Sequence, residues 1–200
     1  MISKPSDIAK KKALLRLEMR AMRRAMSDLE RSQSSLTTSE TLWQFFAKHH
    51  SEFLSRPIAV YLARADELSL DPLISRLLEA GFKICAPRVN IEKDEMSFWK
   101  LDSLDAVAFG PWKIREPISE ERIVPQIVLL PALAFDAKGH RLGMGGGWYD
   151  KTLAHLEGVL RIGVCFETQL LKKVPSEPHD LSVDYVASGS GWFDCLRGNL

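Results

Sequence analysis

The chain has 200 residues, of which 46% are hydrophobic and 26% are charged, and its formal net charge is +1. This composition is typical of a globular protein with one sizeable core. No apolar run approaches the roughly 20 residues that cross a bilayer, and residues 1–7 contain no apolar segment of the secretory type. The three cysteines lack metal-ligand spacing, which suits a reducing compartment. We expect a cytoplasmic monomer without a membrane partner, forming one domain over residues 1–200.

Positive charge is concentrated at the start of the chain. Residues 1–31 hold nine Lys and Arg against four Asp and Glu, a local +5 that leaves −4 for the remainder. A basic segment on a mildly acidic body indicates an anionic partner. That partner could be a nucleotide, another small polyanion or a nucleic acid.

Residues 7–26 have the periodicity of an amphipathic helix. One face carries the apolar stripe Leu15, Met19, Met22 and Met26. Another face carries basic residues at four-residue spacing, where like charges repel unless an anion lies nearby. These residues are Lys12, Arg16, Arg20 and Arg24, and a solvated surface stripe is the alternative interpretation. A capping box at Ser27–Glu30 predicts a second helix to about His50, so residues 1–50 form a basic helical segment packed on the rest.

The next segments predict a strand, a helix and a second strand. Residues 57–63 are a continuous apolar run, as in a buried strand. An amphipathic helix over 70–78 stops at Gly81, and residues 82–87 form the following strand. This order implies a parallel pair joined by a crossover. Residues 96–100 alternate like a half-exposed strand, and residues 102–125, which are interrupted by Gly-Pro and Glu-Pro, are expected to be mostly loop.

Residues 127–133 are the most apolar run and predict a central strand. A turn at 135–138, a helix from Trp148 to about Leu156, a strand at 160–166, a short helix at 167–173 and a last strand at 183–187 follow. The sum predicts an α/β fold: a three-layer α/β/α single domain with a mostly parallel central sheet and two N-terminal helices.

Residues 139–150 combine glycines with opposite charges. Four of the five positions 143–147 are glycines, with Arg141 before them and Asp150 after them. Backbone N–H groups free of side chains can approach an anion, and a helix that begins at Trp148 adds its partial positive charge. The order suits a polyphosphate and a metal ion. The spacing matches neither a Walker A motif nor a Rossmann fingerprint, and a turn that needs positive φ is the alternative.

Two neighbouring segments closely resemble the signature of the 5-formyltetrahydrofolate cyclo-ligase family, whose members are also called 5,10-methenyltetrahydrofolate synthetases. They are Leu130–Asp136 and Gly139–Asp150. Weaker similarities fall in the family's order at residues 12–16, 61–67, 87–89, 114–117, 179–180 and 183–184. The resemblance therefore extends along most of the chain.

The resemblance implies an enzyme and its reaction. Members convert 5-formyltetrahydrofolate and ATP, with Mg²⁺, to 5,10-methenyltetrahydrofolate, ADP and phosphate. The formyl oxygen is expected to take the γ-phosphoryl group, after which N10 attacks the activated carbon and phosphate leaves. Such phosphoryl transfer needs positioning and charge neutralisation rather than a protein nucleophile. The implied partners are thus a reduced folate, ATP and Mg²⁺.

The resemblance also implies roles for single residues. Arg141 and Lys12 would be catalytic, and Asp150 and Asp184 would hold Mg²⁺, a cation that prefers oxygen ligands. The nucleotide would be bound by Lys12, Ala13, Leu14, Leu15, Arg16, Arg141, Leu142, Gly143, Met144, Gly145, Gly146, Gly147, Trp148 and Tyr149. The folate would be bound by Arg16, Leu62, Glu67, Met144, Gly145, Gly146, Gly147 and Trp148.

Two positions depart from the family pattern. The family often has Tyr where this chain has Trp148, and some members have Lys where it has Gly146. A lysine contact to phosphate would then pass to Arg141 and the N-terminal basic residues. Asp150 has an alternative role in the first turn of a helix, and Glu67 an alternative as a solvated turn residue.

Trp112, His140, the three cysteines and two alternative functions remain to be considered. Trp112 either stacks on a ligand or packs in its loop, His140 is expected to be a surface turn residue without a partner, and the cysteines are expected to be small buried residues. A nucleic-acid-binding module would use the basic stripe, but no RRM, KH or zinc-finger signature is present, and we expect no nucleic-acid partner. A relative that binds folate without turnover is the other alternative.

Overall fold

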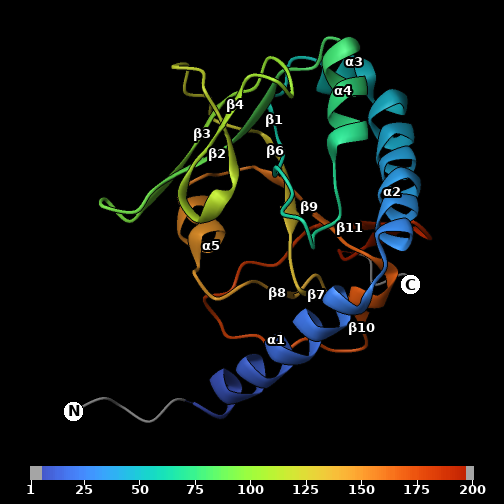
Figure 1. Cartoon of the computed structure of the whole chain (residues 1–200), viewed down its shortest axis with the longest axis vertical. Coiled ribbons are helices and arrows are strands. Elements are labelled where there is room, and N and C mark those ends of the chain that lie inside the picture. Colours follow the sequence, from blue (N-terminus) through green and yellow to red (C-terminus); the bar gives the residue numbers. More distant parts are fainter. Residues whose placement is uncertain (1–5, 197–200) are drawn as a thin grey trace.

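The computed structural model describes residues 6–196. Residues 1–5 and 197–200 lie outside this range, and with them most of the segment searched for a secretory signal. The centre of the molecule is a seven-stranded sheet with the order β12-β11-β9-β6-β1-β2-β3 (Figure 1). Its strands are β1 Ile58–Ala59, β2 Ile84–Asn90, β3 Glu95–Lys100, β6 Ile127–Pro131, β9 Leu160–Val164, β11 Tyr185–Ser188 and β12 Gly191–Asp194.

The sheet is mostly parallel, as the sequence predicts. Strands β2, β1, β6, β9 and β11 run parallel, whereas β3 and β12 pair antiparallel at the two edges. The most apolar strand, β6, lies in the middle of the order. This position fits its composition, because a central strand is covered on both faces and has no need of a polar one.

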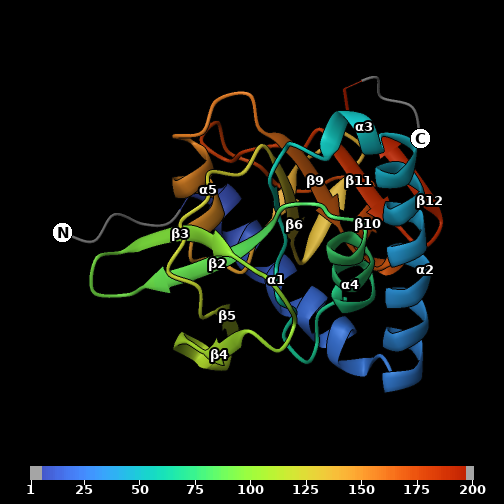
Figure 2. The ribbon, with the colours of Figure 1, turned by 90° about the horizontal axis from the view of Figure 1, so that it is seen from above.

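Side chains alternate between two cores along β6. Ile127 and Leu129 join the cluster beneath helices α2 (Asp28–Lys48), α3 (His50–Phe53) and α4 (Asp71–Glu79). Val128 and Leu130 join the cluster beneath α5 (Trp148–Leu153) on the opposite face. Figure 2 shows α2, α3 and α4 gathered on one side of the molecule and α5 on the other. The α/β fold of three layers is therefore confirmed.

The two N-terminal helices are also confirmed. Helix α1 (Asp7–Ala25) begins at Ser6, whose hydroxyl accepts from the Ala9 N–H at 3.0 Å. Helix α2 begins with the predicted capping box, in which the Glu30 carboxylate accepts from the Ser27 N–H at 2.7 Å. The apolar stripe of α1 lies on a small third core through Met19, which is buried with Leu133, Ala134, Leu142 and Val174.

Two predictions around the small sheet β10-β7-β8 are wrong in part. The chain stays extended through β7 (Ala134–Asp136) and turns only after it, before β8 (Arg141–Leu142). Residues 167–173 form a single 3-10 turn, Glu167–Gln169, followed by β10 (Leu170–Leu171), rather than a helix. The cause is the buried Gln169 amide, which donates to the carbonyls of Ala132 and Leu133 and ties this turn to the segment before β7.

No helix among residues 6–196 is long and apolar enough to cross a bilayer.

Other boundaries depend on contacts between distant segments. The predicted loop 102–125 contains the hairpin β4 (Val107–Phe109) and β5 (Arg115–Pro117), which Arg88 holds to β2 by donating to Pro117 and Ser119. The last strand continues into β12, whose Trp192 stacks on Phe45 of α2 at 4.3 Å between ring centroids. The predicted strand 57–63 forms a ladder only at β1, because the Tyr61 hydroxyl donates to the Leu68 carbonyl and curls the following segment.

The contact between β9 and β7 yields a test of this packing. A Cβ added at Gly163 would lie 2.4 Å from the ring of Phe135, which is fully buried. We expect Gly163→Ala to lower the free energy of unfolding by about 1–3 kcal/mol, the usual cost of overpacking. Urea denaturation measures this. In a Phe135→Leu background the same alanine should cost less, and an equal cost in both backgrounds would contradict the assignment.

Candidate active site

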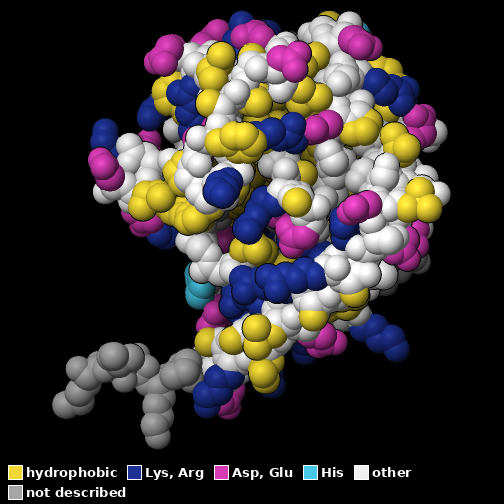
Figure 3. Space-filling view, viewed as in Figure 1, with side chains coloured by type: hydrophobic (Ala, Val, Ile, Leu, Met, Phe, Trp, Pro, Cys, Tyr) yellow, Lys and Arg dark blue, Asp and Glu magenta, His cyan; other side chains and the backbone are white. Residues whose placement is uncertain are grey.

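A cavity of about 730 Å³ lies where the parallel strands β1 and β6 end. Its walls come from α1, the segment after β1, the 3-10 turn between β4 and β5, the glycine segment with the start of α5, and residues 177–180. In the space-filling view, Lys and Arg side chains gather above α1 around a hollow (Figure 3). Ligands of α/β proteins bind at this edge of the sheet, so the position alone favours a functional site.

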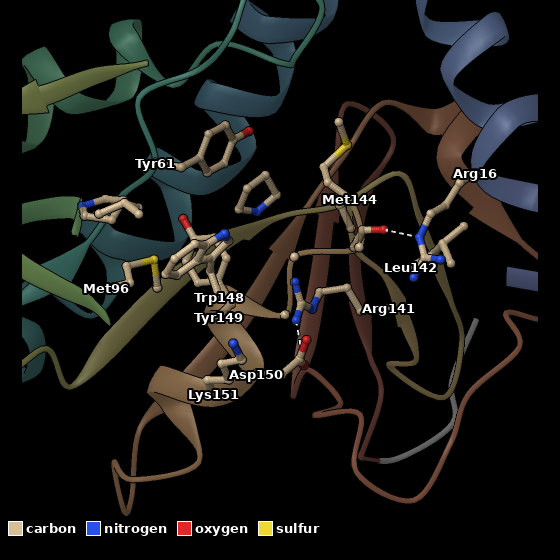
Figure 4. A pocket seen from close by; sticks show the side chains of 18 of the residues that line it. Arg16, Tyr61, Met96, Arg141, Leu142, Met144, Trp148, Tyr149, Asp150 and Lys151 are labelled. Carbon is tan, nitrogen blue, oxygen red and sulfur yellow. Dashed lines mark hydrogen bonds and ion pairs between the residues drawn. The ribbon is translucent and has the colours of Figure 1, made fainter. Parts of the chain in front are cut away.

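The glycine segment is bent by backbone conformations that favour glycine. Gly145 has φ of 109° and Gly147 has φ of 68°, and Gly147 is the N-cap of α5. From α1, Arg16 donates to the Gly143 carbonyl at 2.9 Å (Figure 4). Arg20 donates to the Met144 carbonyl at 3.0 Å. The arginines therefore bind the carbonyl side of the segment and fix it against α1.

Arg141 and Asp150 form an ion pair at the base of this segment. The Arg141 guanidinium donates to Asp150 Oδ1 at 2.7 Å, and the same oxygen accepts from the Leu181 N–H at 3.3 Å (Figure 4). Arg141 is 8% exposed, and its Nε is buried without a hydrogen-bond partner among the described residues. An unpartnered guanidinium N–H in a cavity suits an anionic ligand.

Lys12 lies at another wall of the cavity and is paired with acidic residues. Its ammonium is 2.8 Å from the Glu177 carboxylate and 2.5 Å from the Asp180 carboxylate. Burial opposes the charged form, but the bonds to Asp180 and Glu177 outweigh it and raise the pKa of the Lys12 ammonium. Glu177, His179 and Asp180 have ligand-type atoms within 4.8 Å of one another. Because the Lys12 ammonium already forms ion pairs with two of them, this cluster carries no argument for a metal ion.

Aromatic side chains form the opposite wall. The rings of Trp112 and Trp148 are 5.8 Å apart, and the Lys151 ammonium lies 5.6 Å over the Trp148 ring. Burial first, and the charge of Glu67 second, raise the pKa of both Tyr61 and Tyr149. Their hydroxyls are therefore neutral over the physiological range. Figure 4 shows Tyr61, Trp148 and Tyr149 around one space, with Met96 beside them.

The two departures from the family pattern are one packing unit. A Cβ at Gly146 would lie 2.7 Å from Cδ1 of the Trp148 indole. The indole therefore occupies the space that any larger residue at position 146 would need. Trp112, which the sequence left open, lies half exposed at the cavity with φ of 55°, against Trp148.

Leu62 and Glu67 enter the cavity together. Leu62 is buried, and the Glu67 side chain is only 10% exposed, so Glu67 is not a solvated turn residue. Its Oε2 accepts from the Arg64 N–H at 3.0 Å, and Arg23 of α1 lies behind it. The structure thus brings Glu67 to the same space as the glycine segment.

Other residues implied by the resemblance do not line the cavity. Ala13, Leu14 and Leu15 are on α1 beside Lys12 and Arg16, but Leu14 is exposed and Leu15 packs on the small core. Asp184 is also outside the lining. Both of its carboxylate oxygens accept from Arg161, from the backbone N–H at 2.7 Å and from the side chain at 3.4 Å.

The prediction that His140 lacks a partner is wrong, and its partner, Asp136, is a residue that the sequence analysis did not single out. His140 has a partner, because its Nδ1 lies 3.0 Å from Asp136 Oδ2. The buried Asp136 carboxylate also accepts from the backbone N–H groups of Lys138, His140 and Val174. It thereby fixes the turn that precedes Arg141. A lone acidic residue at the end of an apolar strand is the signal that could have found it.

Arg23 and Glu177 were also missed. Both are long-range partners, of Glu67 and of Lys12, and no local pattern marks them. Cys85 and Cys165 are buried as expected, whereas Cys195 is only half-buried. Burial raises the pKa of the Cys85 thiol to about 12, so this thiol is not an ionised nucleophile.

The fold and the cavity together define an α/β protein with a cavity at the ends of its parallel strands, lined by basic and aromatic side chains. A model of the 5-formyltetrahydrofolate cyclo-ligase family matches residues 8–189. The chain belongs to this family of enzymes.

Individual relatives agree along nearly the whole chain. The 5-formyltetrahydrofolate cyclo-ligase of Mus musculus is 31% identical over 188 residues, covering 86% of this chain and 90% of the mouse protein. That of Saccharomyces cerevisiae is 28% identical, covering 91% and 98%. The 5,10-methenyltetrahydrofolate synthetase structure of Aquifex aeolicus superposes with a TM-score of 0.76 at 27% identity, covering 92% of each chain. The Mycoplasma pneumoniae synthetase, at 20% identity and a TM-score of 0.70, shares the fold.

The Lys12–Asp180 pair predicts a pH-dependent stability. Burial raises the pKa of the Asp180 carboxyl, but the Lys12 bond and the Glu177 N–H outweigh this and lower it overall. Because the folded pKa lies below the unfolded value of about 3.9, the stabilisation is complete above that pH and is lost as pH falls through the folded pKa. We expect Asp180→Asn to lower the free energy of unfolding at pH 7 by about 1 kcal/mol.

Urea denaturation at pH 7 and near pH 2 checks this. The difference between Asp180→Asn and the unmodified chain should shrink at the lower pH. Asp102→Asn, which removes an exposed carboxylate 3.0 Å from Lys100, is the matched control and should change stability little at either pH. A difference for Asp180→Asn that is equal at both pH values would count against the lowered pKa.

Proposed function

We propose that this chain converts 5-formyltetrahydrofolate to 5,10-methenyltetrahydrofolate with ATP and Mg²⁺, releasing ADP and phosphate. The family membership supports the reaction. The observation that supports the function most directly is the cavity itself. In it, the glycine segment and the arginines around it face an aromatic wall and the buried carboxylate of Glu67. This is the combination that a phosphate donor and a pterin need in one space. A cytoplasmic location and a monomer remain part of the proposal.

The proposed reaction has two steps. The formyl oxygen attacks the γ-phosphorus of ATP, the bond to the bridging oxygen breaks, and ADP leaves. The N10 amine then attacks the formyl carbon, the carbon–oxygen bond breaks to release phosphate, and N10 loses its proton. Charge develops on the transferred phosphoryl oxygens, so fixed cations around them lower the barrier.

Basic residues on two sides of the glycine segment fit the phosphates. Arg141 has a buried, unpartnered Nε, and so does Arg20, which also lines the cavity. Arg16 and Lys12, which are already held by the Gly143 carbonyl and by Glu177 and Asp180, line the same cavity from α1 and would contribute at most to its electrostatic potential. In this proposal the backbone N–H groups of Gly145–Gly147 and the amino end of α5 add their dipoles to these charges.

Asp150 fits a Mg²⁺ ligand better than Asp184 does. Hydrogen bonds from the described residues reach Oδ1 of Asp150, which leaves Oδ2 for a cation. Both oxygens of Asp184 are engaged by Arg161, outside the cavity lining. When bound, Mg²⁺ would neutralise charge on the phosphate oxygens. Asp150 would hold it with phosphate and water oxygens, and the role of Asp184 remains a proposal that its ion pair disfavours.

The aromatic wall and Glu67 fit the pterin. Trp148, Tyr61 and Trp112 would cover the faces of the fused ring and exclude water from the reacting formyl group. The Glu67 carboxylate would accept from the ring N–H donors. Because the Tyr61 hydroxyl is occupied by the Leu68 carbonyl, that ring contributes its face and not its hydroxyl.

A nucleic-acid-binding function has little support from the basic stripe. Lys12 is paired with acidic residues, and Arg16 and Arg20 bind carbonyls of the glycine segment. Of the four, Arg24 alone is exposed. A row of phosphates would therefore find one accessible cation where the sequence suggests four.

The absorbance of the methenyl product tests the proposal. We expect the chain to form product from 5-formyltetrahydrofolate only when ATP and Mg²⁺ are both present. Binding of the folate without product would indicate a non-catalytic relative. A shift of RNA or DNA that disappears at moderate salt, with no product, would favour the nucleic-acid alternative.

Replacement of Asp150 tests the metal assignment. We expect Asp150→Ala to reduce kcat about 100-fold, because the charge on the phosphoryl group loses its neutralisation, while the Kd for folate changes less than about twofold. The control is Asp94→Asn, an exposed carboxylate 2.6 Å from Lys151 and outside the cavity lining, which should leave kcat unchanged. An unchanged kcat for Asp150→Ala at saturating Mg²⁺ would remove Asp150 from the metal site.

A further inference from the structure

We propose that Arg23, near the end of α1, is a positioning residue that keeps the Glu67 carboxylate aimed into the cavity. The inference rests on the proposed function, in which Glu67 accepts hydrogen bonds from the pterin. It assigns a role to a residue outside the glycine segment and outside the basic stripe of α1. Arg23 does not itself line the cavity.

Arg23 is the most deeply buried arginine of residues 6–196, with 1% of its surface exposed. Its Nη2 is 2.5 Å from Asp66 Oδ2, and its Nη1 is 3.8 Å from Glu67 Oε1. A guanidinium is always charged, so its burial needs compensation by nearby anions. The two carboxylates of one turn supply that compensation, and the turn is thereby fixed to α1.

The Glu67 carboxylate is held from two sides. Oε2 accepts from the Arg64 N–H at 3.0 Å, and the Glu67 N–H donates to the Arg64 carbonyl at 3.0 Å, which closes the turn. Arg23 lies on the Oε1 side. One oxygen is therefore fixed by the turn itself and the other by a charge from a helix more than 40 residues earlier in the chain.

Arg23 is the buried cation among the groups around the Glu67 carboxylate. The other groups are Asp66 and Arg64 from its own turn, Tyr61 from the segment after β1, and Tyr149 from α5. Both tyrosines are neutral, and Asp66 is an anion that itself pairs with Arg23. The Arg23 guanidinium is thus the group that can hold Oε1 in place from the α1 side.

A merely structural role for Arg23 would have a different signature. Loss of packing would lower stability and affect kcat and KM alike. Loss of positioning would act on the folate side alone. Without the guanidinium, Glu67 Oε1 loses the partner that holds it, so the folate KM should rise while kcat and the ATP KM stay close to those of the unmodified chain.

The experiment compares kcat and the folate KM of the unmodified chain, Arg23→Gln, Arg23→Lys and Glu67→Gln. We expect Arg23→Gln to raise the folate KM about tenfold, as loss of one charge-assisted contact does, with the ATP KM and kcat within about twofold. Arg23→Lys should recover most of the effect. Arg24→Gln, the exposed neighbour on the same helix, is the control and should match the unmodified chain.

Each outcome bears on a separate claim. Absence of product from the unmodified chain would overturn the proposed function and this inference with it. Product together with an unchanged folate KM in Glu67→Gln would overturn the role of Glu67. A raised KM in Glu67→Gln, with Arg23→Gln showing the folate KM of the unmodified chain, would overturn the inference alone. If Arg23→Gln fails to fold, Arg23→Met, a neutral side chain of similar length, takes its place. An unchanged folate KM in that variant, with a raised KM in Glu67→Gln, would then overturn the inference.

Discussion

The site depends on the neutralisation of the cations of α1 by segments that are far away in the chain. Lys12 pairs with residues 177–180, Arg16 and Arg20 bind carbonyls of the glycine segment, and Arg23 pairs with the turn after β1. Together these cations fix three walls of the cavity to one rigid element. Like charges at four-residue spacing repel along a helix, and the partners of Lys12, Arg16 and Arg20 offset that repulsion.

These pairs also show why the charge of this face of α1 was predictable from the sequence and why its partners were not. The stripe predicts an anion, and the anions that the structure supplies are largely the protein's own carboxylates and carbonyl dipoles. A single-chain pattern shows the charge of a helix face but not what lies against it. Lys12 and Arg141 differ in this respect, because Arg141 lines the cavity and keeps one buried Nε without a partner among the described residues.

Elements with strong local patterns were predictable, and those made by distant contacts were not. The central strand β6, the capping box at Ser27 and the glycine segment follow from nearby residues alone. The hairpin of β4 and β5 depends on Arg88, and the turn before β10 depends on Gln169. Periodicity contains no information on such partners. For the site, contiguous residues were found through their motif, whereas second partners from other elements were found only in three dimensions.

The contact between Gly146 and the indole of Trp148 makes these two positions a single unit of variation. A chain that gains a side chain at 146 must at the same time turn or shrink the ring at 148, since the two cannot occupy the same volume. A change from Gly146 to lysine should therefore be accompanied by a change at Trp148. Positions 146 and 148 cannot be varied independently when this part of the cavity is redesigned.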